Sequence, residues 1–407
     1  MKSFGDRPPS RRPGPLLAGV LILVWSLGLW ACGDDALIQQ RQRHLEGLAE
    51  NEPIKLAVVW RQGNDRAFIQ GVELAVAELN AAGGVAGHRL EIVYVDGFSN
   101  LEEARQAVYP LSRDLNVAFA LGFYTSDIAG PLVHLTQYYG IPAMINASAD
   151  EVLKDRWTGG VFRATANTSK IAEVIFAECL KHAPQSVILC YSSNRYTAAI
   201  ASALIPRLRQ AGRIDLQAYR METVTDEWRF KLTESLGNTK FRQRHVAAIL
   251  LLDNLQTIQE LLSILEPEGG VDLVFASETG FDQVLHMVEK LERQLRIPLY
   301  IATDGIHTMM MEREISTSED TMVARFEQIR EKIPNEMMLC GYEQAMTVGQ
   351  AMIQAESAAP DKVKAALRRL EYQGVFQSYA FTDEGELKAP FFFMVVMDQG
   401  HTSGFLR

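Results

Sequence analysis

Short apolar runs alternate with amphipathic stretches along most of this chain. The run at residues 54–60 (IKLAVVW) is mostly apolar, as expected for a strand covered on both faces. A helical periodicity follows at 67–82 (AFIQGVELAVAELNAA), and a run rich in β-branched residues comes next at 89–96 (RLEIVYVD). The same alternation continues to about residue 304, which predicts an α/β fold with parallel sheets covered by helices.

The stretch at 161–169 (VFRATANTS) interrupts this alternation, because it is polar and has no clear periodicity. It forms a natural boundary between two units of the same βα pattern. The sequence therefore predicts two doubly wound lobes, each with a parallel central sheet, joined by a hinge.

The N-terminal segment, residues 1–31, has the pattern of a signal peptide. Basic residues at positions 2, 7, 11 and 12 precede an uncharged apolar run that ends directly before Cys32. The sequence LWAC resembles a bacterial lipobox, so Cys32 is the candidate lipidation site; an uncleaved membrane anchor is the alternative. The polar stretch 32–53 then predicts a tether, with some helix, that holds the body at the membrane outside the cytoplasm.

The glycines in AAGGVAG at 81–87 raise the possibility of a phosphate-binding loop. Such loops precede a helix, where free N–H groups and the positive end of the helix dipole face the anion. Here the helical stretch comes first, and Gly83 and Gly84 follow its end. Glycine in that place supplies a left-handed helix cap, so the sequence predicts a helix stop and no nucleotide site.

Composition argues against several function classes. The net charge is −10, which disfavours nucleic acid as a partner. The eight histidines are dispersed, and no H-E-x-x-H, G-x-S-x-G or C-x-x-C motif occurs, so we expect no enzyme, no metal site and no cofactor. Beyond Cys32, only Cys179, Cys190 and Cys340 remain; buried apolar roles are favoured, with one disulfide left open.

Ligands of open α/β sheets bind beyond the carboxyl ends of strands. In this sequence those positions are occupied mostly by aromatic, hydroxyl and acidic residues, with one amide and one alanine: Trp60, Tyr124, Thr125, Ser126, Ala147, Ser148, Asp253, Asn254 and Asp304. Thr125 and Ser126 open a predicted helix, where a hydroxyl either caps the helix or shares an anion with the free N–H groups. With Ala147 and Ser148 on the neighbouring strand, they form a candidate seat for a ligand carboxylate.

Three segments together resemble type I periplasmic binding proteins of the branched-chain amino acid kind. They are GVELAVAELNAAGGVAGHRLEIVYVDGFSN at 71–100, LGFYTSDIAGPLVHLTQYYGIPAMINASADEVL at 121–153, and FTDEGELKAPFFFMVVMDQG at 381–400. The resemblance covers the body from residue 54 onward and implies that each lobe contains two separate parts of the chain. We expect the N-terminal lobe at 54–165 and about 325–375, and the C-terminal lobe at 166–324 and about 376–407.

The resemblance also implies roles for individual residues. Ser126 and Ala147 match positions that hold the ligand α-carboxylate, whereas Ala149 occupies the place of a family threonine. Either Ser148 substitutes for that threonine, or the anion is held less tightly. Asp304 matches the acid that pairs with the ligand ammonium, although an Asp-Gly turn is the alternative.

Two aromatic residues and one amide complete the candidate site. Tyr196 matches a tyrosine that faces the ligand in the family, and packing is its alternative role. Trp60 can stack on a ligand side chain or pack at the hinge. Asn254 is included because it ends a predicted strand.

The function implied by the resemblance is that of a lipid-anchored solute-binding protein of the periplasm. It closes two lobes around a small amino acid or related carboxylate and delivers it to the permease of an ABC transporter. A ligand-sensing receptor with the same fold and no transport role is the alternative.

Overall fold

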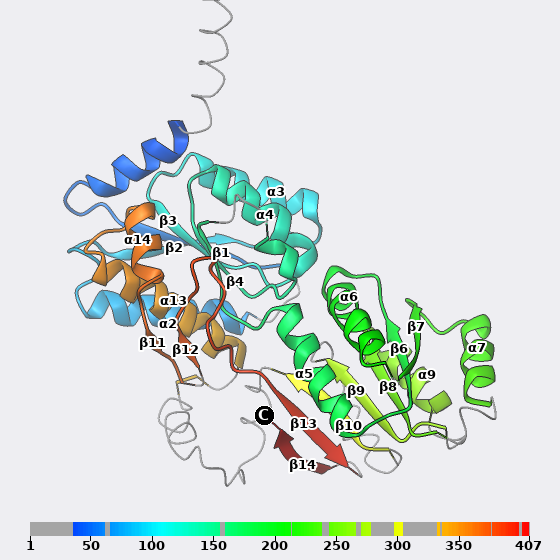
Figure 1. The fold of residues 1–407 in the computed structure, drawn as a ribbon. Coiled ribbons are helices and arrows are strands. Elements are labelled where there is room, and N and C mark those ends of the chain that lie inside the picture. The colour runs from blue at the N-terminus through cyan, green and yellow to red at the C-terminus, as the bar shows by residue number, and fades with distance from the viewer. Residues whose placement is uncertain are drawn as a thin grey trace, which may run out of the picture.

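The computed structural model describes most of the chain beyond the N-terminal segment. The described residues are 36–61, 66–154, 159–212, 214–237, 244–265, 270–277, 297–303, 332–333, 336–375, 377–398 and 401–406. They form two lobes, each built around its own sheet (Figure 1). Cys32 and Asp304 lie outside the described residues.

The first lobe is built around a parallel sheet in the order β2-β1-β3-β4-β5. Its strands are β1 (Ile54–Val59), β2 (Leu90–Val95), β3 (Val117–Gly122), β4 (Ala143–Ile145) and β5 (Val161–Arg163). All six residues of β3 are buried, which agrees with its central place and its uniformly apolar sequence. Apolar clusters cover both faces of this sheet, so the first lobe has a core on each side.

Helices cover the two faces of the first sheet. They are α2 (Ala67–Ala81), α3 (Leu101–Val108), η1 (Tyr109–Ser112), α4 (Ser126–Tyr138), η2 (Asp150–Val152), α13 (Glu336–Gln354) and α14 (Pro360–Leu367). The late helices α13 and α14 pack with α2 in one apolar cluster, so the chain returns to the first lobe after building much of the second. A short hairpin, β11 (Tyr372–Gln373) and β12 (Ser378–Tyr379), completes this side.

The second lobe has a mixed sheet in the order β14-β13-β10-β9-β8-β6-β7. Its strands are β6 (Ser186–Tyr191), β7 (Asp215–Arg220), β8 (Val246–Leu251), β9 (Leu273–Ser277), β10 (Leu299–Thr303), β13 (Phe393–Asp398) and β14 (His401–Leu406). The first five are parallel, and β13 and β14 add to β10 in antiparallel fashion. The helices described here are α5 (Thr168–Lys181), α6 (Arg195–Gln210), α7 (Asp226–Gly237) and α9 (Leu255–Leu265). The predicted fold class, two lobes with parallel central sheets, is confirmed.

The glycine-rich segment after α2 is a helix stop, as predicted. The N–H groups of Gly83 and Gly84 donate to the carbonyls of Asn80 and Leu79, at 3.1 and 2.9 Å. Both glycines have positive φ, 108° and 73°, and a side chain at Gly84 would meet the carbonyl oxygen of His88. The segment therefore turns the chain into β2 and presents no helix start to an anion.

The C-terminal boundary between the lobes differs from the predicted one. Residues 376–390 were expected in the second lobe, but Tyr379, Phe381 and Leu387 belong to the core of the first. Phe381 packs edge-on against Phe162 of β5, with ring centroids 5.2 Å apart. This aromatic contact holds the segment on the first lobe until the chain reaches β13.

The predicted tether contains a helix, as expected, but this helix, residues 36–46, is docked on the first lobe (Figure 1). Its Arg41 is 0% exposed and donates to four backbone carbonyls, those of Leu111, Asp114, Val117 and Tyr139. The polar sequence suggested a solvated segment, whereas these contacts satisfy a buried guanidinium. We call this segment the N-terminal helix.

None of the three described cysteines, Cys179, Cys190 and Cys340, forms a disulfide bond. Burial raises the pKa of the Cys179 and Cys190 thiols to about 12, so both behave as small apolar residues. Among the described residues, no helix is long and apolar enough to cross a membrane.

Candidate functional site

The candidate anion seat lies where β3 and β4 end, at the start of α4. We use the name anion seat for Ser126 together with Ala147 and Ser148. Thr125 precedes the helix with extended backbone angles (φ −93°, ψ 128°), and its side chain makes no capping hydrogen bond. The hydroxyl of Thr125 therefore does not serve as the plain helix cap that the sequence left open.

Ser126 connects the helix start to the loop after β4. It is 6% exposed, and its Oγ accepts a hydrogen bond of 3.3 Å from the N–H of Ala149. The hydroxyl hydrogen is not used in that bond, so it can be donated to a ligand while the contact to Ala149 persists. This arrangement gives the seat one side-chain donor that is held in place by the backbone beside it.

Backbone N–H groups add to the seat. Within the described part of the chain, the hydrogen bonds given by the structure use the N–H of Ala149 and of Asp150, but none uses the N–H of Ala147 or Ser148. The first turn of α4 adds its own N–H groups and the positive end of the helix dipole. Such a constellation suits a carboxylate, because each donor can point at a negative oxygen without a competing acceptor.

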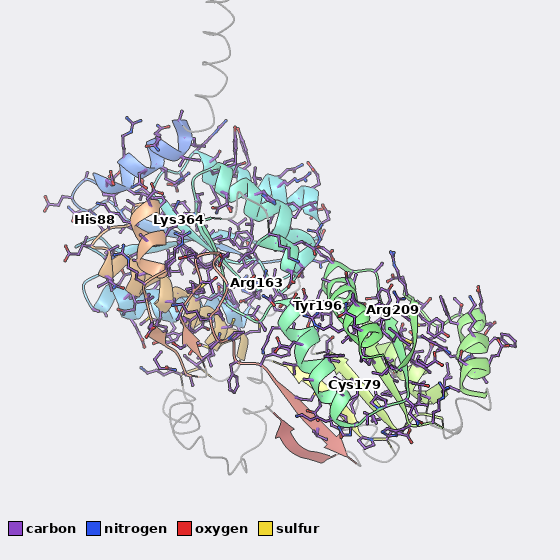
Figure 2. The ribbon with its side chains drawn as sticks, in the orientation of Figure 1. His88, Arg163, Cys179, Tyr196, Arg209 and Lys364 are labelled. Atoms are coloured by element: carbon purple, nitrogen blue, oxygen red, sulfur yellow. The ribbon has the colours of Figure 1, made fainter. Side chains whose placement is uncertain are left out.

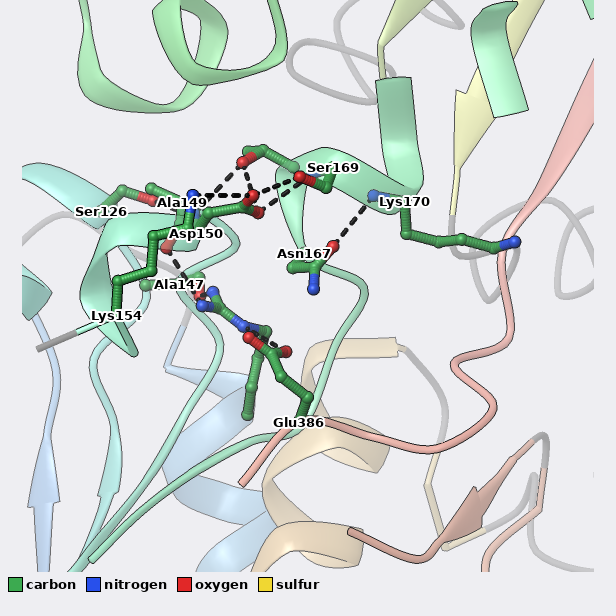
Figure 3. A network of polar contacts seen from close by, with 11 residues as sticks. Ser126, Ala147, Ala149, Asp150, Lys154, Asn167, Ser169, Lys170 and Glu386 are labelled. Carbon is green, nitrogen blue, oxygen red and sulfur yellow. Dashed lines mark hydrogen bonds and ion pairs between the residues drawn. The ribbon is translucent and has the colours of Figure 1, made fainter. Parts of the chain in front are cut away.

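A buried arginine, Arg163, is hydrogen-bonded to the loop of the seat. Figure 3 shows the loop residues Ala147 and Ala149 together with Glu386 in one network of polar contacts. Arg163, the last residue of β5, is 0% exposed and donates to the carbonyls of Ala147 and Ala149 and to the carboxylate of Glu386. Figure 2 shows Arg163 on the side of the first lobe that faces the second, and Tyr196 on the facing side of the second lobe. The loop is therefore fixed at the junction between the lobes.

Asp150 links the seat loop directly to the second lobe. Its carboxylate accepts hydrogen bonds from Thr168 Oγ1, Ser169 Oγ and Ser169 N–H at the start of α5. Burial disfavours the charged form of Asp150, but the hydrogen bonds from Ser169 and Thr168 outweigh burial and hold the pKa of this carboxyl below its usual value. An ionised acid from one lobe thus caps a helix of the other.

A second contact between the lobes lies one residue past the seat. The backbone N–H of Arg195, the first residue of α6, donates to the carboxylate of Asp127 at 3.2 Å. The Arg195 guanidinium also pairs with Glu151 at 3.3 Å. These contacts bring the start of α6, and with it Tyr196, towards the start of α4.

The candidates of the second lobe are less closely tied to a site. Asn254 is exposed, and its side chain accepts a hydrogen bond of 3.1 Å from the N–H of Thr257, so it caps α9. Tyr196 is half-buried and packs against the second core. Asp304 lies outside the described residues, and its expected pairing with an ammonium group stays a prediction.

Trp60 is a core residue in the structure. Its side chain stacks on Phe68, with ring centroids 4.1 Å apart and planes 3° from parallel, and it is 2% exposed. Of the two roles expected for Trp60, the structure favours packing over stacking on a ligand, because Phe68 covers one face of the indole. Tyr124 contacts Trp60 at 5.4 Å and is 45% exposed, so Tyr124 presents the accessible aromatic surface beside the seat.

Sequence reasoning missed Arg163, Asp150 and Arg195 as parts of this region. Arg163 had one signal, a charged residue in the otherwise apolar start of VFRATANTS. In the part of the chain that the structure describes, no group of three His, Cys, Asp or Glu residues is placed to hold a metal ion. The arrangement described is one of binding and positioning.

Comparisons with known proteins identify relatives of this chain. A family model described as periplasmic binding protein matches residues 62–401. Leu/Ile/Val-binding protein homolog 7 of Brucella abortus is 29% identical over 153 residues, 35% of this chain and 38% of that protein. The Leu/Ile/Val-binding protein of Escherichia coli K12 is 27% identical over 172 residues, 40% of this chain and 46% of that protein. The chain thus spans less than half the length of these curated relatives.

The fold is shared with solved structures. An ABC transporter substrate-binding protein from Desulfitobacterium hafniense, in complex with Leu, matches with a TM-score of 0.69 and 17% identity, covering 87% of this chain and 100% of that chain. The names of these relatives are those of binding proteins, in line with the expectation that this chain is not an enzyme. Because the family model covers most of its length, the chain belongs to the periplasmic binding protein family, as the three sequence segments predict.

Proposed function

We propose that this protein is a membrane-anchored solute-binding protein that closes its two lobes around a small amino acid or related carboxylate and delivers it to an ABC importer. The observation that carries the proposal is the anion seat. Ser126 and the N–H groups of Ala147 and Ser148 offer several donors at the start of α4, at the junction of the lobes. The names of the relatives, which refer to Leu, Ile and Val, support an aliphatic amino acid as the ligand.

The second lobe is proposed to hold the other end of the ligand. In this proposal Asp304 pairs with the ligand ammonium, Tyr196 lines the same space, and Asn254 and Thr125 contribute polar contacts. A zwitterion then meets donors on one wall and an acid on the other, so neither charge is buried without a partner.

A thermal-shift panel tests the ligand class, because a ligand that binds only the folded protein raises the melting temperature. We expect L-leucine, L-isoleucine or L-valine to raise it, and leucinamide, which lacks the carboxylate, to have no effect at the same concentration. A shift with neutral sugars and none with amino acids would overturn the proposal.

The membrane anchor is proposed to be an acyl group on Cys32. The helix docked through Arg41 includes residue 36, so the spacer after Cys32 reaches at most about 14 Å. The folded body would therefore lie close to the membrane instead of being connected to it by a long flexible linker. The full-length protein should incorporate a labelled fatty acid and sediment with membranes, and Cys32→Ala should abolish the labelling.

A further inference from the structure

The guanidinium of Arg163 holds two peptide groups of the seat loop, those that follow Ala147 and Ala149. It donates to the carbonyl oxygen of Ala147 and, at 3.0 Å, to that of Ala149. In a trans peptide the C=O and the following N–H point in opposite directions. Because the Ala147 carbonyl points towards Arg163, the N–H of Ser148 points away from Arg163. In the same way, the Ala149 carbonyl points towards Arg163, so the N–H of Asp150 points away from Arg163.

These two N–H groups serve different partners. The N–H of Ser148 belongs to the anion seat, whereas the N–H of Asp150 donates to Thr168 Oγ1, at the start of α5 in the second lobe, at 3.2 Å. A second hydrogen bond connects the start of α5 to the seat loop, because the N–H of Thr168 donates to the carbonyl of Ser148 at 2.8 Å. One side chain thus sets the orientation of the seat and of the first crossover between the lobes.

The third donor of Arg163 reaches the last crossover. Its Nε donates to Glu386 at 3.0 Å, in the segment that leads from the first lobe to β13. The N–H of Arg163 also donates to the carbonyl of Gly385 at 2.8 Å. Gly385 has φ 87°, and a side chain there would meet the Val161 carbonyl oxygen, so the turn lies directly against β5.

We propose that Arg163 is a positioning residue: it orients the backbone donors of the anion seat and, through Glu386, couples them to the crossover that leads into β13. The ligand-binding part of this inference rests on the proposed function. A fully buried cation with three acceptors in two segments, the seat loop and the segment of Glu386, can move only if those segments move together. Opening or closing of the lobes is therefore linked to the geometry of the seat.

The test compares two equally buried arginines of the same lobe in the full-length protein. Arg163→Lys keeps the charge but cannot reach all three acceptors, and Arg41→Lys is the matched control, because Arg41 is also 0% exposed and donates to backbone carbonyls far from the seat. Amide hydrogen exchange is measured without ligand at Ala149 and Asp150, whose N–H groups are hydrogen-bonded. The affinity for L-leucine is then measured by calorimetry.

We expect Arg163→Lys to speed exchange at these two amides and to weaken L-leucine binding by about tenfold, the cost of one lost hydrogen bond to a charged group. Arg41→Lys should lower the melting temperature but leave both quantities as in the wild type. Unchanged exchange in Arg163→Lys, or equal changes in both variants, would overturn the positioning role. If wild-type protein bound no member of the amino acid panel, the proposed function would fail, while the exchange result would still decide the role of Arg163.

Glu386→Gln is the second variant, and it also serves if Arg163→Lys does not fold. Glu386 is partly exposed, and the amide can still accept the Nε–H, so the fold should persist. The loss of charge should speed exchange at Ala149 and Asp150 by a few-fold. Exchange as slow as in the wild type would show that the crossover is not coupled to the seat.

Discussion

The two lobes share a βα architecture but use their buried charges differently. In the first lobe, Arg41, Arg163 and Glu343 are 0 to 1% exposed and bind segments far away in the sequence. In the described part of the second lobe, the buried acid Glu178 pairs inside its own helix, with Lys181 at 2.6 Å.

The helix caps of the second lobe also use hydrogen bonds between residues that are close in the sequence. Asn194 and Asn254 each accept from the N–H three residues on, at 2.9 and 3.1 Å. The buried charges of the first lobe therefore make long-range polar contacts, while the buried charge of the described second lobe, Glu178, makes a local one. We infer that the first lobe fixes the geometry of binding and the second lobe tolerates polar substitutions.

Replacing Arg41 should give the largest effect. Arg41→Met leaves four carbonyls without their donor, and we expect a loss of about 3–5 kcal/mol in the free energy of unfolding, as for other broken buried charge networks. Urea denaturation measures this loss, and limited proteolysis should cut first within the N-terminal helix. The exposed Arg43→Met is the control. A loss below about 1 kcal/mol for Arg41→Met would contradict the contrast between the lobes.

The pH dependence of stability sharpens the comparison. Burial raises the pKa of Glu343 to about 7, although hydrogen bonds from Val375 N–H and Tyr379 oppose the rise. The folded protein therefore binds this proton more tightly than the unfolded chain, so its stabilising contribution is full below about pH 4 and is lost as the pH rises through 7.

Glu343→Gln removes the titrating carboxyl group but keeps a side-chain oxygen that can accept the hydrogen bond from the Tyr379 hydroxyl. Relative to the variant, wild-type stability should fall by about 3 kcal/mol between pH 5 and pH 8, measured by urea denaturation at each pH. Parallel profiles for the two proteins would mean that Glu343 does not take up a proton in this range.

The sequence could predict what depends on local periodicity. Most strands and the helix stop at Gly83 follow from patterns of a few residues, and the resemblance added Ser126 and Ala147. The strand β5 was missed, because the sequence interpretation placed residues 161–163 in a polar boundary, whereas all three are buried in the first sheet. Arg41 and Arg163 could not be predicted as buried, because an arginine is normally exposed unless partners satisfy it. The carbonyl partners of Arg41 lie 70 to 98 positions away, and Glu386 lies 223 positions from Arg163.

A smaller effect is expected at the seat itself. Ser126→Ala removes the hydroxyl donor, and we expect L-leucine affinity to fall about 10- to 100-fold with little change in melting temperature. Ser112→Ala is the control, because Ser112 is half-buried and its hydroxyl donates to the nearby Tyr109 carbonyl, away from the seat. Equal affinities for the wild type and Ser126→Ala would remove the seat from the binding site, whatever the outcome for the arginines.

The smallest effect is expected at Asn254, where capping and ligand contact can be separated. The side chain caps α9 through the N–H of Thr257, so Asn254→Ala should cost about 1 kcal/mol of stability. Asn254→Ser keeps a capping oxygen but removes the amide. If Asn254 only caps, Asn254→Ser should match the wild type in both melting temperature and leucine affinity. If the amide contacts the ligand, Asn254→Ser should bind leucine about tenfold more weakly at unchanged stability, and the second lobe would then share in fixing the ligand.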